Sequence, residues 1–541
     1  MSIINRGLTT LFFALVAFMQ VWAIVPQPRK YTKTAASFIF SEKCVWEFEN
    51  EEQAEIASPL MESINRAAGV NMPMQIGVSK SAKSSVRLLT NSELEEEGYR
   101  LRVESKQIII EASNRRGFYY ALQSLRQLLP ASIASASGAV AEPIVATGCF
   151  VEDWPELKVR AVRLSSNSRE LSKSELLKFI DLVSIFKINR LYWDEVADRV
   201  YPLSRTDLHD IGNYASLRSV EISTDRFVID EQLMEPTIDN TVILQPEDGA
   251  RSTLMDIYNY KPGVGLRYSD KVAGLIGTVM GDENGLSSYD LWQSFPNIMA
   301  LSEIAWCDGE GKSWGDFLKR LDQQLPLLRE MGVDYSTSMY KLHYSTRVRD
   351  GKVLLSVGAI RPDLKVAYTL GGESPIASSQ QIPSPMVITS PTTIFAIAFQ
   401  GEAEVSDPLL LEFVFNKATA KPVFSPGVTA PSLLVDGLKG VGDSQEGWMV
   451  ITDAKRMITI DLQEMTQIGE VRFGAIGLKG VELMYSTDGA QFKPIEIAPL
   501  DLSKSYHTVE GLSLDCRFIK LVLHGGESQD EFMMIDEIEL Y

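Results

Sequence analysis

The amino-acid sequence predicts a multidomain chain in which mixed α/β units come first and all-β units follow. Three observations lead to this prediction. The chain has 541 residues, too many for a single core, and about 150 residues per domain suggests three or four domains. Residues 153–194 have the pattern of a strand, a helix and a strand. After residue 340, short alternating strands are separated by Gly, Pro and Ser.

The first 23 residues have the pattern of a secretory signal peptide. Arg6 supplies a positive charge, residues 11–19 form an apolar run, and Val21 and Ala23 are small residues at −3 and −1 of a cleavage site. The run is shorter than the ~20 apolar residues that span a bilayer. We therefore expect an exported protein, secreted, periplasmic or at the cell surface, with an uncleaved anchor as the alternative.

Two strands and a helix are predicted between residues 98 and 130. Residues 99–103 and 108–111 alternate or run apolar as strands do, and a helix follows from about Gly117. Its expected buried side chains are Tyr120, Leu122, Leu125, Leu128 and Leu129. Residues 131–141 are rich in Ala, Ser and Gly and are expected to form a loop.

The stretch from Asp153 to Asp194 predicts a βαβ unit. Residues 159–164 are short and β-branched. Ser172 and Glu175 have the spacing of a capping box, and apolar residues follow them at helical spacing. Residues 188–193 form the second strand, which the crossover makes parallel to the first.

The C-terminal part of the chain is expected to be all-β. Alternation in residues 351–359, 364–372 and 392–400 predicts a β-sandwich. A last all-β domain is expected to begin near Ser425.

Several of these segments resemble family 20 of the glycoside hydrolases, the β-N-acetylhexosaminidases. The barrel of that family is matched by DWPELKVRAVRL at 153–164, FPNIMALSEIAW at 295–306 and SWGDFLKRLDQQLPLLREMGVDY at 313–335. Residues 98–130 resemble the α+β domain that precedes the barrel. Residues 340–422 resemble a fibronectin-like domain, and the last segment resembles a discoidin-like (coagulation-factor type C) sandwich.

The resemblance implies a multidomain α/β plus all-β architecture. Its parts are a signal peptide (1–23), an α+β N-terminal domain (24–150), an incomplete TIM-like (β/α) barrel (151–337), a fibronectin-like β-sandwich (338–423) and a discoidin-like β-sandwich (424–541). The barrel is called incomplete because 153–335 holds only about 180 residues, whereas a complete barrel typically needs ~250. We expect strands three to five to be absent between Asp198 and about Asp225. Loops, the neighbouring domains or a partner chain would then have to cover the open edges.

The catalytic chemistry implied by the resemblance depends on a pair of carboxylates. The acetamido oxygen of the substrate acts as the nucleophile, a Glu is the general acid, and an adjacent Asp orients the acetamido group. The family carries this pair in a His-x-Gly-Gly-Asp-Glu motif, which does not occur in this sequence. The barrel region contains the Asp-Glu pairs Asp194-Glu195, Asp230-Glu231 and Asp282-Glu283. Asp282 and Glu283 are the weak catalytic candidates, and His209 is expected to lie in a surface loop.

The expected substrate-binding residues are Arg160, Trp193 and Glu283. Arg160 matches the first-strand arginine that holds the 3- and 4-hydroxyls of the sugar in the family, and a guanidinium fork can donate two parallel bonds. The alternative is a strand arginine paired with a carboxylate. Trp193 is either a pocket wall or barrel core, and Glu283 matches a family Glu that binds sugar hydroxyls. Ser165 stands where the family usually has Asp.

Composition narrows the possible partners. The net charge of −19 disfavours nucleic acid and anionic lipid as partners.

The four cysteines allow three full disulfide pairings. No His/Cys cluster has metal-ligand spacing, so we expect no metal and no cofactor.

Three functions are compatible with these observations. The preferred one is an exported β-N-acetylhexosaminidase-related protein that binds N-acetylhexosamine-containing glycans and is catalytically degenerate, a pseudoenzyme. The first alternative is an active β-N-acetylhexosaminidase. The second is a structural surface-adhesion protein that binds through its discoidin-like domain.

Overall fold

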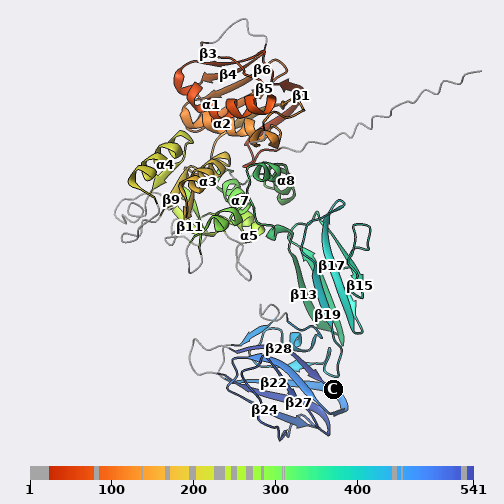
Figure 1. Cartoon of the computed structure of the whole chain (residues 1–541). Coiled ribbons are helices and arrows are strands. Elements are labelled where there is room, and N and C mark those ends of the chain that lie inside the picture. Colours follow the sequence, from red (N-terminus) through yellow and green to blue (C-terminus); the bar gives the residue numbers. More distant parts are fainter. Residues whose placement is uncertain are drawn as a thin grey trace, which may run out of the picture. The chain divides into compact units, whose positions relative to one another are not determined.

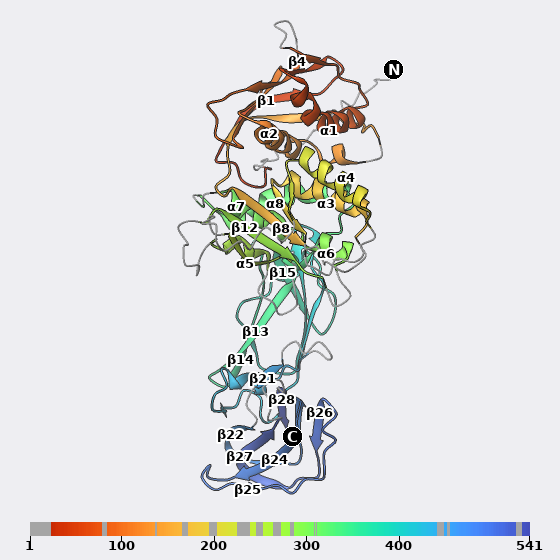
Figure 2. The same cartoon turned by 90° about the vertical axis from the view of Figure 1, so that its left-hand side faces the viewer.

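The computed structural model describes residues 23–77, 84–135, 138–164, 171–193, 203–223, 238–244, 253–262, 272–281, 286–307, 309, 311–440, 448–451, 455–525 and 533–541. Its contacts divide the chain into two compact units, residues 1–338 and 339–541. Figures 1 and 2 show the two units from perpendicular directions. Among the described residues, no helix has the length and apolarity that crossing a bilayer requires.

Unit 1 opens with a seven-stranded sheet whose order is β1-β7-β5-β6-β4-β2-β3. Helices α1 (Glu51–Ala68) and α2 (Arg115–Gln127) lie together beside this sheet (Figure 1) and bury their apolar side chains in one core with it. The strands are β1 (Lys30–Ile39), β2 (Cys44–Phe48), β3 (Met74–Ile76), β4 (Ser84–Thr90), β5 (Tyr99–Val103), β6 (Gln107–Ala112) and β7 (Val145–Asp153).

The predicted elements between residues 98 and 130 are confirmed. Strand β5 has the predicted bounds, and β6 is longer by one residue at each end. Helix α2 begins two residues before Gly117, because the Asn114 side chain accepts from the backbone N–H of Gly117 and caps the helix there. Within the expected loop, residues 131–134 form the short 3-10 helix η1 (Ala131–Ala134).

The second sheet of unit 1 is parallel, with the order β10-β9-β8-β12-β11. Its strands are β8 (Val159–Leu164), β9 (Arg190–Trp193), β10 (Glu221–Ser223), β11 (Ile238–Ile243) and β12 (Gly274–Val279). The helices of this region are α3 (Lys173–Ile185), α4 (Arg205–Leu217), α5 (Leu254–Asn259), α6 (Ser288–Gln293), α7 (Asn297–Trp306) and α8 (Trp314–Glu330).

The predicted βαβ unit is present. Strand β8 has the predicted bounds, and both halves of the Ser172–Glu175 capping box form at the start of α3. Strand β9 is parallel to β8, as expected, but begins at Arg190 rather than at residue 188. The chain turns before it, because Lys187 adopts a positive φ of 62°.

The expected absence of strands three to five is wrong for the third strand. Helix α4 and strand β10 occupy residues 205–223, and β10 pairs in parallel with β9. A βαβ unit needs ~30 residues, and the stretch from the start of β9 at Arg190 to the end of β10 at Ser223 is long enough to hold one. The missed signal is a second capping box, in which Ser204 and Asp207 begin α4.

Unit 2 is built from antiparallel strands, as the alternation predicts. Its first part has one sheet of β13 (Leu342–Arg349), β14 (Lys352–Ala359) and β16 (Met386–Ile388), and a second sheet of β15 (Lys365–Leu370), β17 (Thr392–Gln400), β18 (Ala403–Glu404) and β19 (Leu409–Phe413). The last part has a sheet of β20 (Val423–Phe424), β22 (Lys455–Ile468), β27 (Leu514–His524), β24 (Gly480–Ser486) and β25 (Lys493–Pro494), and a sheet of β21 (Met449–Ile451), β28 (Met533–Leu540), β23 (Val471–Ile476) and β26 (Tyr506–Val509). Both sheets of the last part contribute side chains to one core.

A buried carboxylate ties the two parts of unit 2 together. Asp436 follows the 3-10 helix η5 (Pro431–Val435) and accepts hydrogen bonds from the Thr346 hydroxyl of β13 and, at 2.9 Å, from the backbone N–H of Leu438. Burial raises the pKa of Asp436 to about 6.

All four cysteines lie among the described residues and carry free thiols. Cys44, Cys149 and Cys516 are buried, and Cys307 is partly buried. None of the disulfide pairings that the sequence allows is formed.

Two helical glycines give a matched test of packing in unit 1. A Cβ atom at Gly117 of α2 would lie 2.5 Å from the backbone oxygen of Gly98, whereas a Cβ atom at Gly212 of α4 would meet nothing within 4 Å. We expect Gly117→Ala to destabilise the protein by about 1–3 kcal/mol through overpacking. Gly212→Ala should stabilise it by about 0.5–1 kcal/mol. Urea denaturation of both variants measures the difference, and an equal effect of the two substitutions would contradict it.

Candidate functional site

The five strands of the parallel sheet end at one common edge. In a parallel sheet with crossover helices, the carboxyl ends of the strands carry the active site in characterised barrels. Residues described at this edge include Leu164, Trp193, Ser223, Leu244 and Gly281. The segments that follow them, 165–170, 194–202, 224–237, 245–252 and 282–285, lie outside the described residues.

Most of the carboxylates predicted from the sequence fall in those segments. Asp282 and Glu283, the weak catalytic candidates, follow Gly281 and lie outside the part of the chain that the structure describes. The same holds for Ser165 and for the pairs Asp194-Glu195 and Asp230-Glu231. Trp193 is the last residue of β9 and pairs with Leu164 of β8, and its side chain is not described.

His209 lies on a helix rather than in the expected surface loop. It is exposed on α4, where its Nδ1 is 3.1 Å from the side-chain amide nitrogen of Asn213. The surface position agrees with the expectation, and the capping box at Ser204 explains why the local structure is helical.

One face of the sheet carries a cluster of Arg163, Arg190, Tyr192 and Glu221, which we call the inner face. Arg163 and Tyr192 are register partners on β8 and β9, and Arg190 precedes Tyr192 by two residues on the same face. The guanidinium carbons of Arg163 and Arg190 lie 5.8 Å and 6.0 Å from the centroid of the Tyr192 ring. Arg190 also donates to the Tyr192 hydroxyl at 3.3 Å and to Glu221 at 2.8 Å.

The inner face combines an aromatic ring with two cationic donors and one acceptor. A cation near an aromatic face is attracted by the ring quadrupole. The ring itself is only 2% exposed, so the groups that a polar ligand could reach on this face are the partly exposed arginines and the exposed Glu221. Among the strand side chains that the structure describes in this sheet, Glu221 is the only carboxylate, and it is engaged with Arg190.

The structure corrects the expected environment of Arg160. Residues 160, 162 and 164 of β8 alternate away from the inner face. Arg160 is 0% exposed and matches the alternative that the sequence left open, a strand arginine paired with a carboxylate. Its Nη2 donates to Glu97 at 2.8 Å and to the Tyr120 hydroxyl at 3.1 Å, and its Nε donates to the backbone oxygen of Lys187 at 2.9 Å. A sugar could bind this guanidinium only by replacing one of these bonds.

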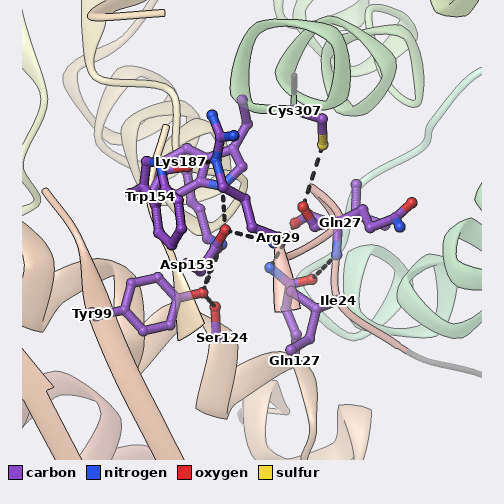
Figure 3. Close-up of polar contacts among 12 residues, drawn as sticks. Ile24, Gln27, Arg29, Tyr99, Ser124, Gln127, Asp153, Trp154, Lys187 and Cys307 are labelled. Atoms are coloured by element: carbon purple, nitrogen blue, oxygen red, sulfur yellow. Dashed lines mark hydrogen bonds and ion pairs between the residues drawn. The ribbon is translucent and has the colours of Figure 1, made fainter. Parts of the chain in front are cut away.

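A second buried ion pair lies between the N-terminal sheet and the parallel sheet (Figure 3). The Lys187 ammonium donates to Asp153 at 2.9 Å and to the Tyr99 hydroxyl at 3.0 Å, and both charged side chains are 0% exposed. Asp153 also accepts from the Trp306 indole at 2.9 Å and from the backbone N–H of Arg29 at 3.1 Å. The Lys187 nitrogen lies 4.3 Å from the Trp306 ring.

Burial shifts the protonation equilibria of Lys187 and of its neighbour Tyr99. Burial lowers the pKa of Lys187, and the Asp153 carboxylate opposes that shift. Burial also raises the pKa of Tyr99 well above its usual range. Since both charges are sealed from solvent and fully engaged, we assign the pair a structural role.

The sequence analysis missed the residues of these two ion pairs. Their partners are separated by 34 residues for Lys187 and Asp153 and by 63 residues for Arg160 and Glu97. The one available signal is a lysine at the end of the apolar helix pattern, since a lysine that is fully buried needs a partner.

Among the described residues, no group of three or more His, Cys, Asp or Glu side chains is placed to hold a metal ion.

Comparisons with known proteins relate the chain to the hexosaminidases. A family model, "Glycosyl hydrolase family 20, domain 2", matches residues 22–154. Over 179 residues the chain is 31% identical to a β-hexosaminidase of Porphyromonas gingivalis, and this alignment covers 33% of the chain and only 23% of that relative.

The fold of the chain is similar to that of solved hexosaminidases. A variant β-hexosaminidase of Streptomyces plicatus in complex with its product GlcNAc has a TM-score of 0.51 at 15% identity, covering 58% of this chain and 96% of that one. The N-acetyl-β-hexosaminidase of the same organism in complex with Thio-NAglucal has a TM-score of 0.50 at 14% identity, with coverage of 58% and 96%. The chain is therefore β-hexosaminidase-like, with a mixed α/β fold of this kind followed by further β-sheets.

The buried Lys187–Asp153 pair gives a testable prediction. We expect Lys187→Met to lower the free energy of unfolding by about 3–5 kcal/mol, because it leaves the Asp153 carboxylate buried without a cation. The double variant with Asp153→Asn should lose much less than the sum of the two single losses.

Lys30→Met is the control for this cycle. Its side chain is 61% exposed and 2.7 Å from Glu152, so the change should cost at most about 1 kcal/mol. Urea denaturation followed by tryptophan fluorescence measures all four variants. Additive losses at residues 153 and 187 would contradict the coupling.

Proposed function

We propose that this chain is an exported relative of the β-N-acetylhexosaminidases that binds N-acetylhexosamine-containing glycans without hydrolysing them. The family relationship supports the ligand class, since a structural neighbour is described in complex with its product GlcNAc. The signal-like pattern of residues 1–23 supports export to the cell surface, the periplasm or the medium. The discoidin-like segment, 424–541, would add a second glycan- or surface-binding module.

One observation carries the non-hydrolytic part of the proposal. Substrate-assisted hydrolysis needs a general acid beside a second carboxylate, and the His-x-Gly-Gly-Asp-Glu motif is not found in the sequence. The described strand side chains of the parallel sheet offer one carboxylate, Glu221, and it is engaged in an ion pair with Arg190 at 2.8 Å.

The inner face is the binding surface that we assign to the sugar. The ring of Tyr192 is only 2% exposed and supports Arg163, and the partly exposed Arg163 and Arg190 would supply the donors to the sugar. Arginine suits neighbouring hydroxyls because its donors are held in a planar fork. Two further residues would contribute to sugar binding from the carboxyl edge of the sheet. They are Trp193, the last residue of β9, and Glu283, which follows β12 in the sequence.

An active hydrolase is the alternative that the same sheet allows. Glu283 would then be the acid, or a partner chain that covers the open edges at β10 and β11 would supply it. Surface adhesion through residues 424–541 alone is the second alternative.

The first prediction concerns turnover. We expect residues 24–541 to release no chromophore above background from an aryl N-acetyl-β-glucosaminide between pH 4 and pH 8, because the sequence lacks the His-x-Gly-Gly-Asp-Glu motif that would supply the general acid. Glu283→Gln is the diagnostic variant, and it should behave as the unmodified chain does. Turnover that Glu283→Gln abolishes would establish the active hydrolase instead.

The second prediction concerns binding. We expect N-acetylglucosamine to bind, and Arg163→Gln to weaken the affinity about tenfold, the effect of losing a hydrogen bond to a charged donor. Arg349→Gln, whose side chain is 79% exposed in unit 2, is the control and should not change the affinity. Titration calorimetry measures both variants.

The binding assay also separates the alternatives. Affinity that is unchanged in Arg163→Gln would reject the inner face as the binding surface. Affinity that disappears only when residues 424–541 are removed would favour the adhesion protein.

A further inference from the structure

Four helices of unit 1 bring a group of arginines together. Helix α1 contacts α2, α2 contacts α3, and α3 contacts α4 (Figures 1 and 2). Arg66 lies in the last turn of α1, Arg126 lies in the last turn of α2, and Arg218 caps the end of α4. Helix α3 adds one carboxylate, Asp181. We call these four residues the arginine cluster.

Two of the three arginines are engaged with other groups of the protein. Arg218 donates from its Nε to Asp181, and its guanidinium carbon lies 3.3 Å from the centroid of the Tyr214 ring. Asp181 also accepts from the Tyr214 hydroxyl at 2.9 Å. Arg66 donates to two backbone oxygens in residues 133–135 at 3.3 Å and 3.4 Å. A cation at the end of a helix is favourable in itself, so these two arginines need no ligand to explain them.

Arg126 differs from the other two because one of its donors is unmet. Its Nε is buried and has no hydrogen-bond partner among the described residues. Burial lowers the pKa of Arg126, and the charges of Arg218 and Arg66 lower it further, while Asp181 opposes the shift. An arginine nevertheless stays protonated in a protein. The chain therefore keeps a positive charge beside other positive charges and leaves one of its donors unsatisfied.

Such an arrangement lowers the stability of the ligand-free protein. A buried donor without a partner loses its hydration and gains no hydrogen bond in return. Exceptions of this kind in a folded protein are typical of functional sites. The net charge of the whole chain is −19, which repels anions in general, so an anion will bind where cations are gathered.

The cluster is accessible from solvent. Arg66 is exposed and Arg126 is partly exposed, although its Nε is buried. The side chains of Arg218 and Asp181 are 16% and 35% exposed. A small ligand can therefore reach the guanidinium of Arg126 without opening the core of unit 1.

We propose that the arginine cluster binds an oxyanion, a sulfate or phosphate group, and that Arg126 is its main ligand. A guanidinium presents a planar fork of donors that fits two oxygens of such a group. The anion would supply the partner that Arg126 lacks and would offset the charges of Arg66 and Arg218. The site is carried by helices and shares no residue with the inner face of the parallel sheet, so the inference goes beyond the proposed function. The oxyanion can be a free ion or part of an acidic sugar.

Titration calorimetry of the full chain with inorganic phosphate at constant ionic strength tests the site. Arg126→Met removes the donors and keeps an apolar side chain, and we expect it to weaken phosphate binding at least about tenfold. Arg116→Met is the matched control. Arg116 lies on the same helix but is paired with Glu97 at 3.0 Å, so its loss should leave the phosphate affinity unchanged. Equal affinities of Arg126→Met and the unmodified chain would overturn the proposal.

Urea denaturation separates a binding role of Arg126 from a structural one. Without phosphate, Arg126→Met should raise the midpoint urea concentration, because it removes a buried donor that has no partner. Arg116→Met should lower the midpoint, because Glu97 loses a partner. Phosphate should stabilise the unmodified chain and leave the Arg126→Met midpoint unchanged. A lower midpoint for Arg126→Met, with the same response to phosphate as the unmodified chain, would show a structural residue and reject the site.

Asp181→Asn gives a prediction of the opposite sign. The carboxylate repels an incoming anion and occupies Arg218, so its neutralisation should strengthen phosphate binding about fivefold, the effect of one like charge removed at close range in water. Weaker phosphate binding in this variant would contradict an anion at the cluster.

A sulfated sugar distinguishes the two sources of the oxyanion. N-acetylglucosamine 6-sulfate that binds more tightly than phosphate, and loses that advantage in Arg126→Met, would identify an acidic sugar as the ligand. Binding of both probes with the same Arg126-dependent affinity would identify the free ion. Binding of neither probe in an Arg126-dependent manner would overturn the site. Unsulfated N-acetylglucosamine tests the inner face instead, so the two proposals fail separately.

Discussion

The carboxylate of Asp153 is the group on which the arrangement of unit 1 depends. It is fully buried and accepts from the Tyr99 hydroxyl, the Lys187 ammonium, the Trp306 indole and the Arg29 backbone N–H. These donors come from the N-terminal sheet, the turn before β9, helix α7 and the segment that precedes β1. An isolated buried charge costs several kcal/mol, so each of these elements has to reach its place for the carboxylate to be compensated.

Two other buried arginines of unit 1 are also paired with carboxylates from other parts of the chain. Arg160 is bound to Glu97 from the N-terminal sheet region, and Arg320 of α8 is bound to Glu303 of α7. Buried ion pairs contribute little net stability, but breaking one is costly, so they favour one arrangement over others. The carboxyl edge of the parallel sheet differs, because its inner face carries partly exposed arginines near an aromatic ring. On β8, Arg160, which pairs with Glu97, and Arg163, a candidate binding residue, thus lie on opposite faces of the strand.

The sequence predicts the local elements of this chain and misses what depends on distant partners. The capping box at Ser172 and the strand at 159–164 are readable because their signals lie within a few residues. The role of Arg160 cannot be read in this way, because its position on a strand does not show which distant carboxylate will pair with it. The third strand was not predicted, because the barrel region was judged too short to hold all the strands. The capping box of Ser204 and Asp207 was a local signal for the helix that precedes this strand. The predicted carboxylates at residues 282 and 283 lie outside the described residues, so the candidate site is known only from its strand face.

The buried segment at residues 23–29, in which Ile24 and Val25 are 0% exposed, has a consequence for synthesis on the ribosome. Ile24 emerges well before its partner Arg320, which lies 296 positions later in the chain. At the usual ~5–20 residues per second, the beginning of unit 1 waits roughly 15–60 s for the helix that holds it. Contacts of such long sequence separation raise the contact order and slow folding. Residues 23–29 therefore stay without their buried partners until most of unit 1 has been synthesised.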